Sequence, residues 1–488
     1  MWTKLVFAAA ACLALPQLAH AQDAKATLDG VAKAMGDVKS VQYTGSGAYF
    51  PFGQAYTPGT AWPRFGVKSW TRTADYEAPA MRDEYVRADG DPTARGGGGA
   101  LPPGTKGTQA VSGKHAWNQV GENPPGPALT AVNDRLYQLW ITPHGFIKAA
   151  AKFNGTAETK TEGGKPVTTI SIAVPGQLKM KGHVNDKKLV EKVEAWTTSP
   201  VMGDVLIETT YADYKDFGGL QFPTKITQKT GGFPTLELNI TEAKANVPLE
   251  LKVPDNVAAA SVRVQADKVA DGVWYLTGGS HHSVLVEMND HLVMIEGPQD
   301  DARALAVIAE AKKLVANKPV KYVVNSHKHF DHSGGLAAFV AEGVTVVTHE
   351  TNKAFFEQSL AAPRTVWPDK LAQSGKKPVV EAFKEKHVMT DASRTIELHL
   401  IQGSSHDEGI IMAYLPKEKL LVEADAYTPA PPNTAPPAKP NPSHVNLYDN
   451  IERLKLTVET ILPLHGRKVP LSEPVSYTHL TLPTILRV

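Results

Sequence analysis

Residues 326–332 hold the densest group of potential metal ligands in the chain. They read Ser-His-Lys-His-Phe-Asp-His and follow directly on a short apolar run. In an extended segment residues i and i+2 point the same way, so His327 and His329 can bind one ion. Asp331 and His332 follow where the chain turns, and they can reach a second ion beside the first. Zinc favours imidazole nitrogen and carboxylate oxygen, and a catalytic zinc site leaves one position for water. The segment therefore predicts a catalytic metal site.

The pattern His-x-His-x-Asp-His resembles the motif of the metallo-β-lactamase fold superfamily, and the resemblance covers about residues 262–467. Three further potential ligands follow in the order that this resemblance implies. They are His406 after Gly403-Ser404-Ser405, Asp425 after the apolar run 420–424, and His465 after Pro463-Leu464. The resemblance implies two zinc ions per chain. Its implied ligands are His327, His329 and His406 at one zinc, Asp331, His332 and His465 at the other, and Asp425 bridging both.

The implied fold of residues 257–475 is an αββα sandwich, in which two sheets face each other and helices cover the outside. The sequence pattern agrees, because strand-like and helix-like segments alternate. Residues 301–316 have helical spacing, and residues 320–324 form a predicted strand that ends at the ligand segment. The metals are expected on loops at the open edge of the sheets.

Residues 22–256 predict a separate β-rich domain, so the whole chain is assigned to the α+β class. Residues 24–35 predict a helix, and the following alternation predicts an antiparallel curved sheet. Its clearest predicted strands are residues 41–50, 168–174, 189–197, 205–214 and 236–240. The aromatic pattern from Tyr211 to Pro223 resembles that of lipoprotein-carrier-type half-barrels.

The two ends of the chain are expected to lie outside these domains. Residues 1–21 combine Lys4, an apolar run and Ala19-His20-Ala21, which predicts a cleaved signal peptide and a periplasmic or secreted protein. Cys12 is the only cysteine and leaves with that peptide, so Asp425 has to serve where some relatives use cysteine. Residues 476–488 resemble translated sequencing-adaptor sequence, so we expect the natural C-terminus to differ from there.

Composition and net charge bear on which classes of binding partner the chain is expected to have. The chain is 42% hydrophobic and 21% charged, which is ordinary for a globular protein. A formal net charge of +1 gives no reason to expect nucleic acid or an anionic membrane as partner. No later stretch approaches the roughly 18 apolar residues that a membrane span requires. We therefore expect a small-molecule substrate, and the oligomeric state stays open.

The expected reaction is hydrolysis of an ester, lactone, thioester or amide bond by a metal-bound hydroxide. Asp331 is expected to bind the second metal and to orient the hydroxide. Tyr427 is either a donor to the developing oxyanion or a packed aromatic residue. True β-lactamases of the superfamily generally carry cysteine or serine near the position of Asp425. The aspartate is more similar to thioesterases, lactonases and phosphodiesterases, although cleavage of a β-lactam stays possible.

Three alternatives remain open at this stage. The same site also suits a phosphodiesterase, or an iron-dependent sulfur dioxygenase that relies on fewer ligands. In the third alternative, the N-terminal domain binds lipid or envelope material that the metal domain then processes. For Asp407 we weigh a partner of a ligand imidazole against a solvated loop carboxylate, and favour the latter. Three dispersed histidines are interpreted as surface or structural residues, namely His115, His144 and His183. Four others could face the cleft but show no ligand spacing, so we favour a structural role for them, namely His281, His282, His349 and His444.

Overall fold

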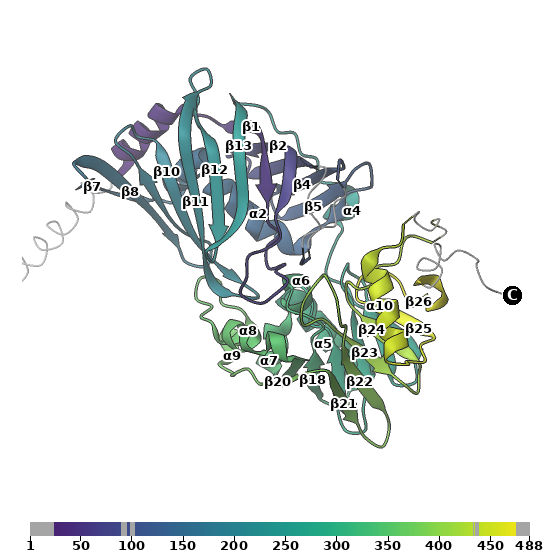
Figure 1. The fold of residues 1–488 in the computed structure, drawn as a ribbon. Helices are drawn as coiled ribbons and strands as arrows, with labels where there is room; N and C mark the ends of the chain where they lie inside the picture. The colour runs from purple at the N-terminus through teal and green to yellow at the C-terminus, as the bar shows by residue number, and fades with distance from the viewer. Residues whose placement is uncertain (1–23, 89–94, 98–102, 433, 435–438, 475–488) are drawn as a thin grey trace, which may run out of the picture.

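The computed structural model describes residues 24–88, 95–97, 103–432, 434 and 439–474. The predicted signal peptide and the tail 476–488 lie outside these residues. A large curved sheet forms the N-terminal part, and a smaller sandwich of two sheets forms the C-terminal part (Figure 1). The sheets change over between Ala245 and Gln265, on either side of the boundary expected at residue 256. Among the described residues, no helix is long and apolar enough to cross a membrane.

The N-terminal sheet has 13 strands, and every neighbouring pair is antiparallel. Its strand order is β6-β5-β4-β3-β2-β1-β13-β12-β11-β10-β9-β8-β7. The strands are β1 (Ser40–Tyr49), β2 (Phe65–Asp75), β3 (Ala80–Arg87), β4 (Lys106–Ser112), β5 (His115–Val120), β6 (Gly126–Pro127), β7 (Thr156–Glu162), β8 (Lys165–Val174), β9 (Leu178–Val184), β10 (Val190–Ser199), β11 (Gly203–Asp216), β12 (Gln221–Thr230) and β13 (Phe233–Ala245). The antiparallel curved sheet predicted from the alternation is confirmed.

The order shows two meanders that meet at one pair of strands. Neighbours within β1–β6 and within β7–β13 follow each other along the chain, whereas β1 pairs with β13 and brings Val41 opposite Ala245. Glycine is needed in β1 at this pair. A Cβ atom on Gly45 would stand 2.2 Å from the carbonyl oxygen of Asn239, and one on Gly47 would stand 1.9 Å from that of Glu237.

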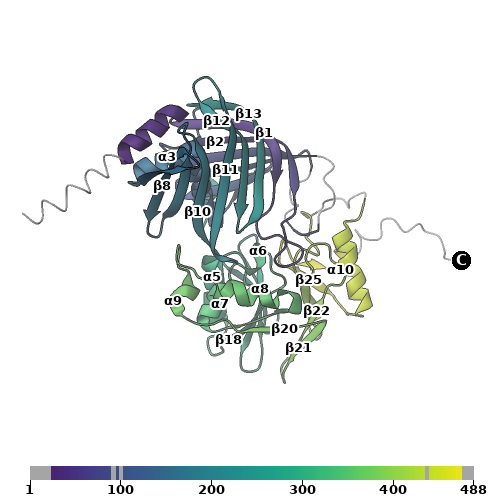
Figure 2. The same cartoon turned by 60° about the vertical axis from the view of Figure 1, so that its left-hand side comes forward.

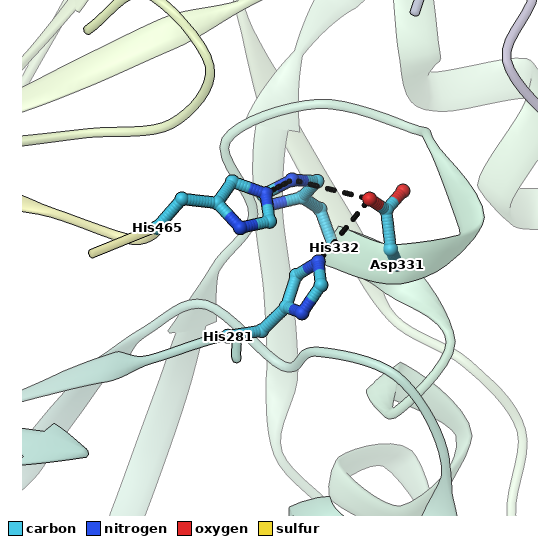
Figure 3. A group of neighbouring side chains, drawn as sticks. All are labelled: His281, Asp331, His332 and His465. Atoms are coloured by element: carbon cyan, nitrogen blue, oxygen red, sulfur yellow. Dashed lines mark hydrogen bonds and ion pairs between the residues drawn. The ribbon is translucent and has the colours of Figure 1, made fainter. Parts of the chain in front are cut away.

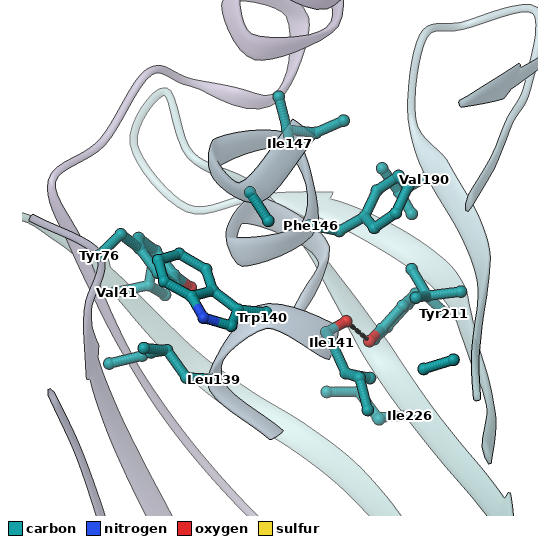
Figure 4. Packing of buried hydrophobic residues seen from close by; sticks show 14 of the residues in the cluster. Val41, Tyr76, Leu139, Trp140, Ile141, Phe146, Ile147, Val190, Tyr211 and Ile226 are labelled. Atoms are coloured by element: carbon teal, nitrogen blue, oxygen red, sulfur yellow. Dashed lines mark hydrogen bonds between the residues drawn. The ribbon is translucent and has the colours of Figure 1, made fainter. Parts of the chain in front are cut away.

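Helices pack on one face of this sheet and fill its curve. They are the residues 24–35, α2 (Val132–Ile141) and α3 (Pro143–Lys152). Figure 4 shows Trp140, Phe146 and Ile147 from α2 and α3 packed against strand residues such as Tyr211. One interior cavity, between Arg72 and Tyr211, holds about 10 Å³. That volume suits about one water molecule and leaves no space there for a lipid chain.

The C-terminal part is the predicted αββα sandwich. Its first sheet contains β14 (Gln265–Ala270), β15 (Val273–Thr277), β16 (Ser283–Glu287), β17 (Leu292–Ile295), β18 (Val320–Val324), β19 (Thr345–His349) and β20 (Val380–Phe383). The second contains β21 (Lys386–Thr390), β22 (Thr395–Leu400), β23 (Ile411–Leu415), β24 (Leu420–Glu423), β25 (Thr460–Pro463) and β26 (Val469–Pro470). One apolar core lies between the sheets and includes Val324 of the first and Val422 of the second.

Helices cover both outer faces of the sandwich. The first sheet packs against α5 (Asp301–Leu314), α7 (Leu336–Glu342), α8 (Glu350–Ala361) and α9 (Lys370–Ser374), and the second packs against α10 (Pro442–Arg453). Local sequence fixes α5, because the Asp300 side chain accepts from the Arg303 amide at its start and Lys312 and Lys313 stand in its last turn. The short helix α6 (Phe330–Ser333) follows β18 and faces the N-terminal sheet in both views (Figures 1 and 2).

Candidate metal centre

The first group of predicted ligands meets at one point. His327 and His329 follow β18, whereas His406 and Asp425 stand on the loops after β22 and β24. His329 Nδ1 lies 3.0 Å from His327 Nε2 and 2.9 Å from His406 Nε2, and the last two atoms are 3.3 Å apart. Asp425 Oδ2 lies 3.4 Å from His327 Nε2 and 3.1 Å from His406 Nε2. Four potential ligand atoms therefore converge.

The second group adjoins the first through Asp425. Its Oδ2 lies 2.8 Å from His332 Nε2, and its Oδ1 lies 3.2 Å from His465 Nε2. The two imidazole nitrogens are themselves 2.9 Å apart. Asp331 and His281 complete this group, as Figure 3 shows, with His281 Nε2 lying 3.2 Å from Asp331 Oδ2. Asp425 contacts both groups, and its backbone has a φ of 57°, in a region where aspartate is tolerated better than most residues.

Hydrogen bonds behind the imidazoles decide which nitrogen carries the proton. A carbonyl oxygen only accepts, so the contact between His329 Nε2 and Ala55 O, at 3.0 Å, places the proton on Nε2. His332 Nδ1 lies 3.3 Å from the Glu296 carboxylate and donates to it in the same way. With these protons on the outer nitrogens, His329 Nδ1 and His332 Nε2 are the atoms that each ring turns toward its ligand group. Such an arrangement fits a cation, and separations near 3 Å are close to the ~3.3 Å edges of a tetrahedron with zinc–nitrogen bonds of ~2.0–2.1 Å.

The electrostatics of the two groups agree with this reading. Burial, reinforced by the neighbouring imidazoles, holds the pKa values of His327 and His329 well below the ordinary range. Burial also lowers the pKa of His332, but the carboxylates of Asp425 and Asp331 outweigh it and hold that pKa well above its usual value. Burial opposes ionisation of Asp425, yet His406 and His332 outweigh it and keep its pKa well below normal. In the metal-free centre His327 and His329 are thus neutral, whereas a protonated His332 pairs with ionised Asp425.

Comparison with known proteins agrees with the geometry. Residues 276–458 match the family model described as the metallo-beta-lactamase superfamily. This part of the chain belongs to that superfamily. Members of the superfamily are generally metal-dependent hydrolases. No curated protein sequence matches the chain.

Solved structures similar to this metallo-beta-lactamase domain include a metallo-beta-lactamase from Pontibacter korlensis, with 19% identity, 44% of this chain and 96% of that chain covered, and a TM-score of 0.34. A metallo-beta-lactamase from Hirschia baltica shows 20% identity over 44% of this chain and 95% of that chain, with a TM-score of 0.33. The rubredoxin oxygen:oxidoreductase of Desulfovibrio gigas shows 16% identity over 44% of this chain and 59% of its own, with a TM-score of 0.34.

Tyr427 lies apart from the two ligand groups of the metallo-beta-lactamase domain. Its ring is buried against His444, and its hydroxyl donates to Glu473 Oε1 at 3.0 Å. The packed-aromatic interpretation therefore describes its surroundings, and its role as an oxyanion donor stays a prediction.

Two interpretations of residues beside the ligands are wrong. Asp407 is fully buried rather than solvated, and it forms an ion pair with the equally buried Lys328. His281 is one of the four side chains in the second group rather than a purely structural histidine. Its sequence neighbourhood, Gly278 to His282, shows no ligand spacing. It reaches the site because His281 forms a β-bridge with His465.

Glu296 is the main residue of the site that the sequence analysis missed. It directly follows β17, is fully buried, and has a φ of 79°. Its carboxylate accepts from the Ser326 hydroxyl, from Asn325 Nδ2 at 2.8 Å and from His332 Nδ1. A signal was present, because Asp425 is likewise an acidic residue close to the end of a strand, two residues after β24.

Proposed function

We propose that the chain is an exported hydrolase with two zinc ions per chain, acting on ester, lactone, thioester or amide bonds. The observation that carries the proposal is the pair of ligand groups that share Asp425, with His329 Nδ1 and His332 Nε2 turned toward the centre. When bound, zinc lowers the pKa of water to about 7 and polarises a carbonyl oxygen. The residues present fit zinc, because they offer imidazole nitrogen and carboxylate oxygen.

The protein's own groups hold and orient this centre. Glu296 and the Ala55 carbonyl fix the protons of His332 and His329 on the outward nitrogens, so each ring keeps one orientation. Asp425 reaches both groups with its two oxygens and is proposed to bridge them. Asp331 is proposed to bind the second ion and to accept a hydrogen bond from the attacking water.

Metal analysis and a hydrolysis panel test the proposal. We expect two zinc ions per purified chain, and hydrolysis that chelator abolishes and zinc restores. The panel should span β-lactams, lactones, thioesters, aryl esters and phosphodiesters. Cleavage of phosphodiesters alone would transfer the proposal to the phosphodiesterase alternative. One iron per chain with sulfur oxidation would refute it.

Variants assign the reaction to the centre. His327→Ala and Asp425→Ala should each abolish hydrolysis while the protein stays folded. His387→Ala is the control, because His387 lies on the edge strand β21 and belongs to neither ligand group. Full activity of the Asp425 variant would contradict the bridging role. Export is tested separately, by finding the protein in the periplasm or medium with residues 1–21 removed.

A further inference from the structure

A segment of the N-terminal domain, residues 52–57, lies directly behind the ligands. Gln54 Nε2 donates to Asp331 Oδ1 at 2.8 Å, across 277 residues of sequence. The next carbonyl, that of Ala55, accepts from His329 Nε2 at 3.0 Å. Gln54 and Ala55 are both buried. One residue of each ligand group is therefore hydrogen-bonded to the other domain.

We propose that Gln54 is a positioning residue of the second metal site and that the N-terminal domain completes the metal centre. The inference rests on the proposed zinc binding. Gln54 occupies Asp331 Oδ1, which leaves Oδ2 directed at His281 and His332. The carboxylate is thereby held in one plane with one oxygen available to an ion. Partners of this outer kind are worth about 10–100-fold in metal affinity.

The segment is held in place by contacts that do not involve the ligands. Lys328, between the two ligand histidines, extends its Nζ to Ala55 O at 2.7 Å and to Tyr56 O at 2.9 Å. The Glu408 amide also donates to Tyr56 O, at 3.1 Å. Phe52 packs edge-on against Phe330 with ring centroids 6.0 Å apart. Gln54 is thus presented by an anchored loop, as preorganisation of a site requires.

Gly97 supplies an independent way to disturb the same contact. Its amide donates to Gln54 O at 3.1 Å, and its φ is outside the left-handed region. A Cβ atom at this position would stand 1.8 Å from Gln54 Oε1 and 2.9 Å from His406 Cε1. Gly97→Ala should therefore displace the Gln54 amide while residue 54 itself is unchanged.

The experiment titrates the metal-free full-length protein with zinc in competition with a chromophoric chelator. For the wild type we expect two zinc ions per chain. Gln54→Leu, which keeps the bulk and removes the donor, should weaken one of the two sites by about 10–100-fold and leave the other unchanged. Gly97→Ala should weaken binding in the same direction. Gln109→Leu is the matched control, because Gln109 donates to the Tyr85 hydroxyl within the N-terminal sheet and belongs to neither ligand group.

The outcomes separate the two proposals. Wild-type titration curves for both Gln54→Leu and Gly97→Ala, beside a wild type that binds two zinc ions, would overturn this inference alone. Equal weakening of both sites together with a lower melting temperature of the metal-free Gln54→Leu protein would also overturn it, because a general structural loss behaves in that way. A wild type that binds no zinc would remove the proposed function and this inference with it.

Discussion

Replacing Glu296 by glutamine tests whether the buried carboxylate decides which ring nitrogen of His332 carries the proton. Of its two oxygens, Oε1 accepts from the Asn325 side chain and from the backbone amide of Ser326, and this amide cannot turn. Oε2 accepts from the Ser326 hydroxyl and His332 Nδ1, which can rotate or move their proton. We therefore expect the new amide nitrogen to take the place of Oε2. His332 must then carry its proton on Nε2, the nitrogen that faces Asp425.

The size of the effect follows from that tautomer. A misdirected proton on one ligand should weaken zinc binding by about 10–100-fold, which is about 1.4–2.7 kcal/mol. Loss of charge-assisted hydrogen bonds should also lower the stability of the metal-free protein by about 1.5–3 kcal/mol. Chelator competition measures the first quantity, and urea unfolding measures the second.

A second buried glutamate is the control for this prediction. Glu418 pairs with Arg394 at 2.7 Å, and both side chains are almost fully buried. Glu418→Gln should lower stability to a similar degree and leave zinc affinity unchanged, because neither residue belongs to a ligand group. Unchanged zinc affinity in Glu296→Gln would refute the tautomer argument.

Three further outcomes are expected. Lys328→Met should destabilise the protein by about 3–5 kcal/mol, because it leaves the buried carboxylate of Asp407 without its cation; urea unfolding should show a partial recovery in the double variant with Asp407→Asn. Burial lowers the pKa of His144 from 6.5 to about 4. The unfolded chain then binds the proton first as pH falls, so up to about 3 kcal/mol of stability present above pH 6.5 should be lost by pH 4, and His144→Leu should flatten that pH dependence. Removal of zinc by a chelator should lower the melting temperature of the wild type more than that of Asp425→Ala, which keeps the three imidazoles of the first group, and equal shifts in both would contradict the assigned site.

The convergence of His327 and His329 was predictable because their spacing is local. His327 and His329 stand two residues apart after a strand whose bounds, 320–324, the apolar pattern predicted without error. The outer partners were not predictable. The Ala55 carbonyl has no residue type to recognise, and Gln54 meets Asp331 only through the packing of two domains. A short motif identifies potential ligands, whereas the residues that hydrogen-bond to those ligands are brought to them only by the tertiary fold.

The antiparallel strands of the N-terminal domain were predicted, but the helices that pack on the sheet after residue 131 were not. Regular alternation in strands such as β10 identified them, since every second residue from Val193 to Ser199 is buried. Helices α2 and α3 were not predicted, although Thr142 caps α3 and Pro143 stands at its first position. The missed helices fill the curve of the sheet. The likeness to half-barrel carriers stays a prediction.

The pairing of β1 with β13 has a consequence for how the chain reaches this state. Each meander can assemble from neighbours soon after it is synthesised, but the strand that joins them must wait about 200 residues for its partner. Until then β1 exposes an unpaired edge, the kind of surface on which chains aggregate. We therefore expect chaperones to bind the newly made chain at the open edge of β1. We do not expect them to act on slow formation of the sandwich.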